Sequence, residues 1–212
     1  MNYLAHLYLA EDSDESLIGN LLGDFVKGHL QNDYSPEIIK GIKTHRKVDA
    51  YTDSNEKFRA CKKLLRPDRR RFAGIIVDLS FDHFLAKYWS EYSNVELSDF
   101  TNRVYELLRS REATLPEKLR DRLPIMIEED WLGSYKSLDG IALALYRISK
   151  RISRRFEKAQ SIEGGIEDIN SNYKELEDNF KEFFPELITF VENYRNTNFE
   201  SEDLPSADLL AN

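Results

Sequence analysis

Two aspartates and a histidine lie on the apolar side of one predicted helix, where ionised carboxylates are not expected. Asp78 and Asp82 are four residues apart and His83 follows directly, so all three share a face with aliphatic and aromatic side chains. An ionised carboxylate is costly to remove from water unless a cation, a metal or a shared proton compensates its charge. We therefore interpret these three residues as part of a metal site. The alternative is structural pairing with Arg or Lys side chains from other helices.

A second predicted helix repeats this pattern. His45, Asp49 and Asp53 follow one another at intervals of four and share the side that carries two isoleucines. His45 and Asp49 have the alternative of a buried hydrogen-bonded pair. Asp53 has the alternative of a helix N-cap, because an acidic residue, Glu56, follows it three positions later.

Two further candidates lie nearer the amino terminus. Asp24 shares a predicted helical face with leucines, so we expect it to point inward. Gly19 and Gly23 precede it, and each weakens a helix by roughly 1 kcal/mol relative to Ala. Glycines at such positions usually permit close approach of another backbone or a ligand. His6, in a short apolar segment, is a further candidate, although a histidine in that setting is more often a core residue.

The candidate ligands are imidazoles and carboxylates, which is the ligand set of divalent Mn, Fe or Mg, whereas structural zinc usually recruits thiolates. The single cysteine, Cys61, excludes a cysteine-rich zinc site and an internal disulfide, and its neighbours predict a buried helical position. On a helical scaffold such ions serve the hydrolysis of phosphate esters, because they activate water and neutralise phosphoryl oxygens. The sequence contains neither a P-loop nor a G-x-S-x-G motif.

The elements that would position these residues are helices. Gly and Pro number 9 and 6 in 212 residues, and apolar residues recur at spacings of three and four, so we expect an all-α, single-domain fold. We expect the helical domain to span residues 1–195, with 196–212 as an acidic tail. Pro185 should kink or divide the last helix. The predicted helices are 16–30, 36–53, 67–92, 97–111, 137–160 and 168–193.

Charge is distributed unevenly along the chain. The formal net charge of -8 argues against general nucleic-acid binding, which depends on neutralising phosphates. One basic segment offers a docking surface for an acidic partner, with a solvated basic helix as the alternative. Its predicted partner-binding residues are Arg147, Lys150, Arg151, Arg154 and Arg155. There is no signal-peptide pattern and no run of about 18 apolar residues, so we expect a cytoplasmic protein that does not enter a membrane.

Four segments resemble the acyl carrier protein phosphodiesterases, a divergent branch of the HD phosphohydrolases. These segments are MNYLAHL at 1–7, GNLLGDFV at 19–26, HRKVD with the following TD at 45–53, and DLSFDHFL at 78–85. The resemblance implies a helical HD-like fold and dependence on Mn²⁺, with Mg²⁺ or Fe²⁺ as other options. It also implies hydrolysis of holo acyl carrier protein, an acidic protein partner, to the apo protein and 4'-phosphopantetheine.

The resemblance carries roles onto eight residues of this chain. The implied metal ligands are Asp24, His45, Asp82 and His83. We assign Asp49 and Asp78 as catalytic residues, which would act as further ligands or orient the ligands and water, with His6 and Asp53 as additional candidates. This chain departs from ordinary HD enzymes in one respect. Those enzymes have an adjacent His-Asp pair, whereas the adjacent pair here is Asp82-His83, in the reverse order. The alternatives are a phosphohydrolase of nucleotides or other small phosphoesters and a non-catalytic helical binding protein.

Overall fold

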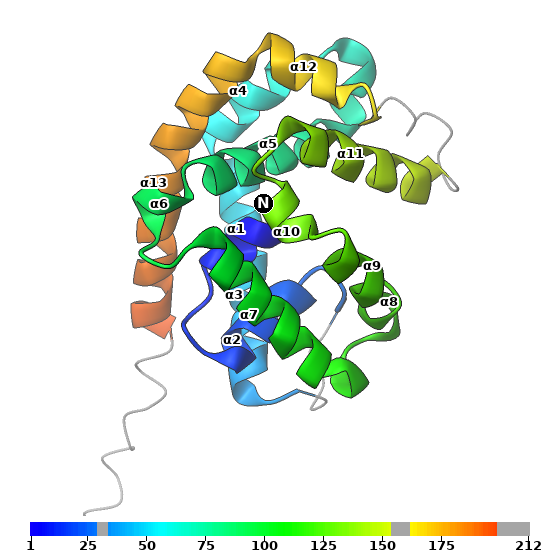
Figure 1. Cartoon of the computed structure of the whole chain (residues 1–212). Coiled ribbons are helices and arrows are strands. Elements are labelled where there is room, and N and C mark those ends of the chain that lie inside the picture. Colours follow the sequence, from blue (N-terminus) through cyan, green and yellow to red (C-terminus); the bar gives the residue numbers. More distant parts are fainter. Residues whose placement is uncertain (29–33, 154–161, 199–212) are drawn as a thin grey trace, which may run out of the picture.

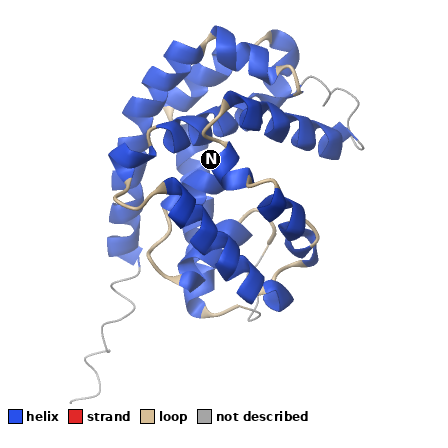
Figure 2. Ribbon diagram, viewed as in Figure 1, coloured by secondary structure: helices blue, strands red, loops and turns tan. Residues whose placement is uncertain are grey.

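The computed structural model describes residues 1–28, 34–153 and 162–198, and within these ranges the chain forms helices and loops without a strand (Figures 1 and 2). The all-α prediction is confirmed. The helices are α1 (Tyr3–Tyr8), α2 (Asp14–Leu22), α3 (Pro36–Ser54), α4 (Glu56–Leu64), the 3-10 helix η1 (Pro67–Phe72), α5 (Ala73–Lys87), α6 (Trp89–Tyr92), α7 (Leu97–Ser110), the 3-10 helix η2 (Glu112–Thr114), α8 (Glu117–Arg120), α9 (Leu123–Glu128), α10 (Trp131–Ser134), α11 (Leu138–Ser153), α12 (Gly165–Ser171) and α13 (Tyr173–Asn198).

Helix α5 is the centre of the fold and packs against α1, α4, α11, α12 and α13 (Figure 1). It is apolar around most of its circumference, which is typical of a helix buried on all sides. Its buried side chains join those of the surrounding helices in one hydrophobic core, which also includes Cys61, as predicted. Among the described helices, none combines the length and apolar character needed to span a bilayer.

The boundary between α3 and α4 follows local sequence signals. Ser35 caps α3 by accepting a hydrogen bond from the Ile38 amide, and Pro36 occupies the first turn, as predicted. Asn55 caps α4, so the cap considered for Asp53 belongs to Asn55 instead. The Asp53 side chain is exposed and lies 3.6 Å from the Lys62 ammonium.

Three predicted helices differ in their extent from those of the structure. The predicted helix 16–30 corresponds to α2, which ends at Leu22, so Asp24 lies beyond the helix rather than within it. The segment 67–92 divides into η1, α5 and α6, and α13 continues through Pro185 without division. Buried Phe183 and Phe184 before Pro185 and buried Leu187 and Val191 after it anchor α13, so tertiary packing outweighs the lost backbone hydrogen bond. Positions 154–160 of the predicted fifth helix and 199–212 of the predicted tail lie outside the described residues.

Helices α2 and α3 cross at very short range through two glycines. A Cβ atom added to Gly19 would lie 2.4 Å from the Ile38 carbonyl oxygen, and one added to Gly41 would lie 2.8 Å from the Gly19 Cα. Only glycine permits backbones to approach this closely. The crossing confirms the close approach predicted at Gly19 and brings the end of α2 against His45 of α3.

Candidate functional site

Two histidines and an aspartate form the centre of the candidate site. The rings of His6 from α1 and His45 from α3 are stacked, with centroids 3.6 Å apart and an interplanar angle of 16°. The Nε2 atoms of His6 and His45 lie 3.1 and 3.2 Å from different oxygens of the Asp49 carboxylate. One ligand atom from each of these three residues lies within 4.8 Å of the others, which is close enough to hold one metal ion.

The backbone fixes the orientation of the His45 ring. Its Nδ1 lies 2.7 Å from the Asn20 carbonyl oxygen, which can only accept a hydrogen bond, so Nδ1 carries a proton. In the neutral ring, Nε2 then has its lone pair directed toward Asp49. A carbonyl behind the ring in this way is typical of metal-binding histidines. Gly23 leaves room for the ring, since an added Cβ would lie 2.1 Å from the His45 Cγ.

The protonation states of His6 and Asp49 suit a divalent ion. Burial and the neighbouring His45 lower the pKa of His6 to about 3, so its ring is neutral near pH 7. Burial acts to raise the pKa of Asp49, but its close contacts with the His45 and His6 rings outweigh burial and hold the pKa well below its usual range. The group therefore offers neutral imidazole and an ionised carboxylate, the forms in which these side chains bind metals.

Two more carboxylates flank this group. The Met1 ammonium lies 3.0 Å from Asp78 and 3.4 Å from Asp49. Burial acts to lower the pKa of this amino group, but the two carboxylates outweigh it and raise the pKa to about 10. Asp24 lies on another side, 3.8 Å from the Nε2 of His45. We call His6, His45, Asp49, Asp24 and Asp78 the imidazole–carboxylate cluster.

The structure directs Asp82 and His83 away from this cluster. Both oxygens of Asp82 accept hydrogen bonds from the first turn of α1, from the amides of Leu4 at 2.8 Å and Ala5 at 3.2 Å. The Nδ1 of His83 lies 2.9 Å from the Tyr135 carbonyl oxygen, and its Nε2 lies 2.8 Å from the Tyr173 hydroxyl. The structure therefore brings Asp24, His45, Asp49 and Asp78 together, whereas Asp82, His83 and Asp53 have other partners. His6 lies at the centre of the cluster, and the Met1 amino group, which no sequence pattern indicates, lies beside it.

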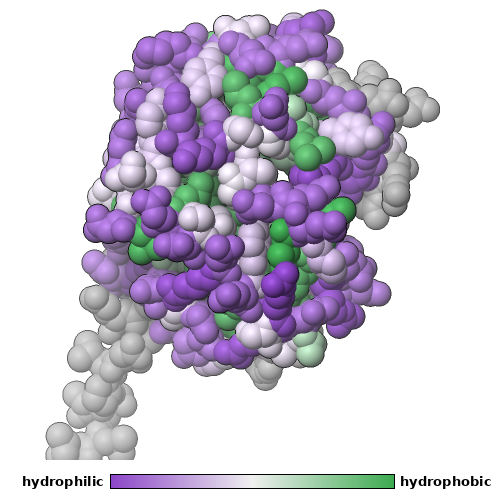
Figure 3. Space-filling model, viewed as in Figure 1, coloured by the Kyte–Doolittle hydropathy of each residue, from purple (hydrophilic) through white to green (hydrophobic). Residues whose placement is uncertain are grey.

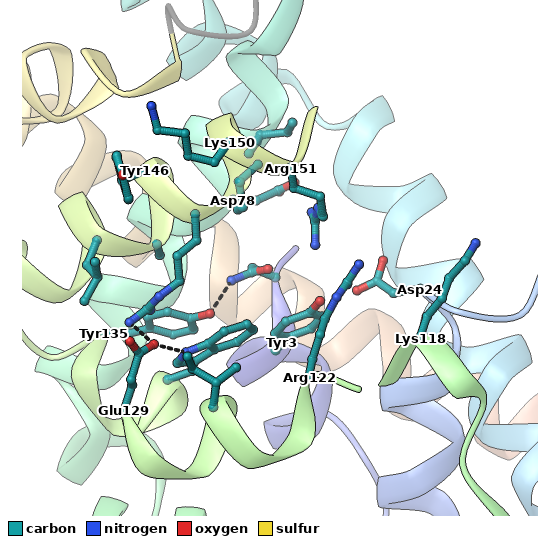
Figure 4. Close-up of a pocket in the computed structure, with 18 of the residues that line it drawn as sticks. Tyr3, Asp24, Asp78, Lys118, Arg122, Glu129, Tyr135, Tyr146, Lys150 and Arg151 are labelled. Atoms are coloured by element: carbon teal, nitrogen blue, oxygen red, sulfur yellow. Dashed lines mark hydrogen bonds and ion pairs between the residues drawn. The ribbon is translucent and has the colours of Figure 1, made fainter. Parts of the chain in front are cut away.

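A cavity of about 840 Å³ opens beside the cluster (Figure 4). Asp24 and Asp78 reach it from the cluster, and Tyr3, Trp131 and Tyr135 contribute aromatic wall. The exposed large hydrophobic side chains of the described residues are Val95, Ile125, Leu143 and Tyr146, and the last three line this cavity. Figure 3 shows hydrophobic side chains beside a hollow in an otherwise largely hydrophilic face.

The cavity is also lined by cations of the predicted partner-binding segment. Arg147 pairs with Glu129 and lies over the Trp131 ring, and Lys150 lies 3.7 Å from Glu163. Arg151 lines the cavity with them. The other two predicted residues of this surface, Arg154 and Arg155, lie outside the described residues. The described part of the basic segment therefore faces the candidate site.

Because the His6 ring is buried, we expect the stability of the metal-free protein to decrease at acidic pH. The pKa of His6 in the folded protein, about 3, lies below the usual histidine value of 6.5, so between these two pH values the unfolded chain binds more protons and stability falls as pH falls. Between pH 6.5 and 4.5 the protonation of His6 should lower the free energy of unfolding of the wild type by about 2 to 3 kcal/mol. His6→Gln should remove this part of the pH dependence. Urea unfolding of both proteins in EDTA measures it. Equal pH slopes for the two proteins would contradict the assignment.

The chain is similar to known proteins over most of its length. The family model described as acyl carrier protein phosphodiesterase matches residues 1–187. The acyl carrier protein phosphodiesterases of Serratia proteamaculans and Yersinia pestis are 34% and 35% identical to this chain over 189 residues, which cover 89% of this chain and 96% of each relative. That of Escherichia coli O6:H1 is 32% identical over the same shares of both chains. No solved structure matches. Since both the family model and these relatives span most of its length, the chain belongs to the acyl carrier protein phosphodiesterase family.

Proposed function

We propose that this protein hydrolyses the phosphodiester that joins 4'-phosphopantetheine to a serine of holo acyl carrier protein, giving the apo protein and free 4'-phosphopantetheine. The names of the family and of its relatives supply the substrate and the class of reaction. The observation in this chain that supports the chemistry is the convergence of His6, His45 and Asp49 within 4.8 Å, next to a cavity.

The proposed cofactor is a divalent ion, with Mn²⁺ first and Mg²⁺ or Fe²⁺ as other options. His6, His45 and Asp49 would hold it, and the donor set fits because an imidazole nitrogen of each histidine lies 3.1 to 3.2 Å from an Asp49 oxygen and all three ligand atoms lie within 4.8 Å of one another. When bound, such an ion lowers the pKa of water and neutralises charge on a phosphoryl group. The geometry favours Asp49 as a ligand rather than as the catalytic base, because both of its oxygens face imidazole nitrogens.

The remaining carboxylates are proposed to act on the substrate side. Asp24 lines the cavity and lies 3.8 Å from the Nε2 of His45, so it can orient a water molecule between the ligand group and the substrate. Asp78 also lines the cavity, and its ion pair with the Met1 ammonium fixes its carboxylate. Asp82 and His83 have backbone and tyrosine partners of their own, which favours a positioning role for them.

The direct test is to incubate the protein with holo acyl carrier protein and Mn²⁺ and to follow the carrier by mass spectrometry. We expect loss of the prosthetic group with Mn²⁺ and no loss in EDTA. A small phosphodiester and a nucleotide in parallel reactions separate the proposed activity from a general phosphohydrolase. An intact holo carrier after incubation with Mn²⁺, Mg²⁺ or Fe²⁺ would contradict the proposal.

Gly23→Ala should disturb the proposed metal site without changing any ligand. The added Cβ would overlap the His45 ring, so the ring must move, and we expect a loss of about 1–3 kcal/mol of stability and weaker binding of Mn²⁺. The matched control is Gly74→Ala in α5, where an added Cβ meets nothing within 4 Å and stability should be unchanged or about 1 kcal/mol higher. Thermal melts with and without Mn²⁺ measure both effects, and identical behaviour of the two variants would count against the packing argument.

A further inference from the structure

We propose that Arg122 and Arg151, together with the Tyr3 hydroxyl, form a clamp for the phosphate group of the prosthetic arm, and that Ile125, Leu143 and Tyr146 contact its pantetheine part. The inference rests on the proposed function, whose substrate carries both parts. It adds a binding site for the phosphate that is separate from the proposed metal ligands.

The first observation is that the two arginines have no carboxylate partner. Within residues 1–28, 34–153 and 162–198, no carboxylate oxygen lies within 4.0 Å of the Arg122 or Arg151 guanidinium. By contrast, Arg147 on the same cavity pairs with Glu129, and Arg69 pairs with Asp168 at 2.8 Å. The cavity therefore holds two arginines whose charges the described chain leaves without an ion pair.

The second observation is that these arginines come from different elements and extend toward one another. Arg122 precedes α9, Arg151 lies in the last turn of α11, and in Figure 4 both side chains reach toward the space above Tyr3. The electrostatics agree, because burial and the Asp24 carboxylate raise the pKa of Tyr3 whereas Arg151 and Arg122 oppose that rise. Two guanidinium groups repel each other at short range, and an anion between them removes the repulsion.

The third observation is the position of this pair relative to the imidazole–carboxylate cluster. Asp24, a member of the cluster that lies 3.8 Å from the Nε2 of His45, lines the same cavity as Arg122 and Arg151. Burial raises the pKa of Asp24, and the charges of His45 and Arg151 oppose that rise. A phosphodiester held by Arg122 and Arg151 would consequently lie next to the proposed metal ligands. Arginine suits this role because its planar guanidinium donates paired hydrogen bonds to phosphate oxygens.

The fourth observation is the apolar surface beside the arginines. Ile125, Leu143 and Tyr146 are 45%, 43% and 47% exposed, and all three line the same cavity. Its volume of about 840 Å³ lies in the range of small-molecule sites, roughly 300–1,000 Å³. The pantetheine arm, a flexible chain of methylene, methyl and amide groups, matches an apolar wall that begins beside an anion site.

The test measures binding alone, by titration calorimetry in EDTA with 4'-phosphopantetheine and with pantetheine, which lacks the phosphate. We expect wild-type protein to bind the phosphorylated ligand at least about tenfold more tightly. The double variant Arg122→Gln/Arg151→Gln should lose that preference and keep its affinity for pantetheine. The matched control, Arg70→Gln/Arg109→Gln, removes two exposed positive charges outside the cavity and should bind as the wild type does.

The outcomes separate the clamp from the proposed function. A double variant that keeps the wild-type preference for the phosphorylated ligand, or a wild type that has none, would overturn the clamp even where hydrolysis of the holo carrier is observed. If the preference depends on the two arginines but the carrier stays intact with metal, the clamp stands and the proposed reaction fails. Circular dichroism melts verify folding, and the two single variants replace the double variant should it unfold.

Discussion

His45→Gln should abolish hydrolysis and the stabilisation by Mn²⁺, whereas His83→Gln should preserve both. His45 lies with His6 and Asp49 in the proposed ligand group, so we expect its loss to reduce turnover at least about 100-fold. An ion that binds only the folded state stabilises it by about 2.7 kcal/mol at 100 times its dissociation constant, and this increment should vanish in His45→Gln. Thermal melts with and without Mn²⁺ give the second readout independently of activity.

His83 is the matched control because it is the same residue type in a similarly buried position. Its side chain meets the Tyr135 carbonyl and the Tyr173 hydroxyl, so His83→Gln should lower stability by about 1–3 kcal/mol through these hydrogen bonds. The increase in melting temperature with Mn²⁺ should remain. A variant at His83 that no longer responds to Mn²⁺, together with a responsive His45 variant, would contradict the proposed ligand group and place the metal at His83 instead.

Helical periodicity was sufficient to predict the fold class and some of the helix boundaries. The Ser35-Pro36 start and the break near Asp53 follow from local chemistry, namely a side-chain cap and a proline that needs no amide partner. The continuity of α13 through Pro185 does not follow from local chemistry. Contacts with residues distant in the sequence decide it, and no window of sequence contains them.

The same limit applies to the candidate site. Periodicity predicts that a side chain points inward, but it does not predict which group it meets there. Asp49 and Asp82 have the same sequence pattern, yet one meets two imidazoles and the other meets backbone amides of α1. The partners of Asp82 and His83 lie 52 to 90 residues away along the chain. The ammonium of Met1 is a backbone group, so the periodicity of side chains does not indicate its position.

Asp82→Ala should unfold more easily rather than simply lose activity. Asn2, the N-cap residue of α1, provides no side-chain hydrogen bond to the helix. Asp82 instead accepts hydrogen bonds from the amides of Leu4 and Ala5 in the first turn. Burying two amides without partners costs about 1–3 kcal/mol each, so we expect a loss of about 2–5 kcal/mol in the free energy of unfolding.

The lower stability of α1 in this variant should also weaken the proposed metal site, because α1 carries His6. Just below its melting temperature, Asp82→Ala should bind Mn²⁺ more weakly than the wild type, and at low temperature, where α1 is still docked, it should regain a Mn²⁺-dependent increase in stability. Asp53→Ala, which removes an exposed carboxylate from α3, is the control and should change stability by no more than about 0.5 kcal/mol. Urea unfolding at two temperatures, with and without Mn²⁺, distinguishes the two roles of Asp82. A variant with wild-type stability and no response to Mn²⁺ at any temperature would identify Asp82 as a direct ligand instead of the cap of α1.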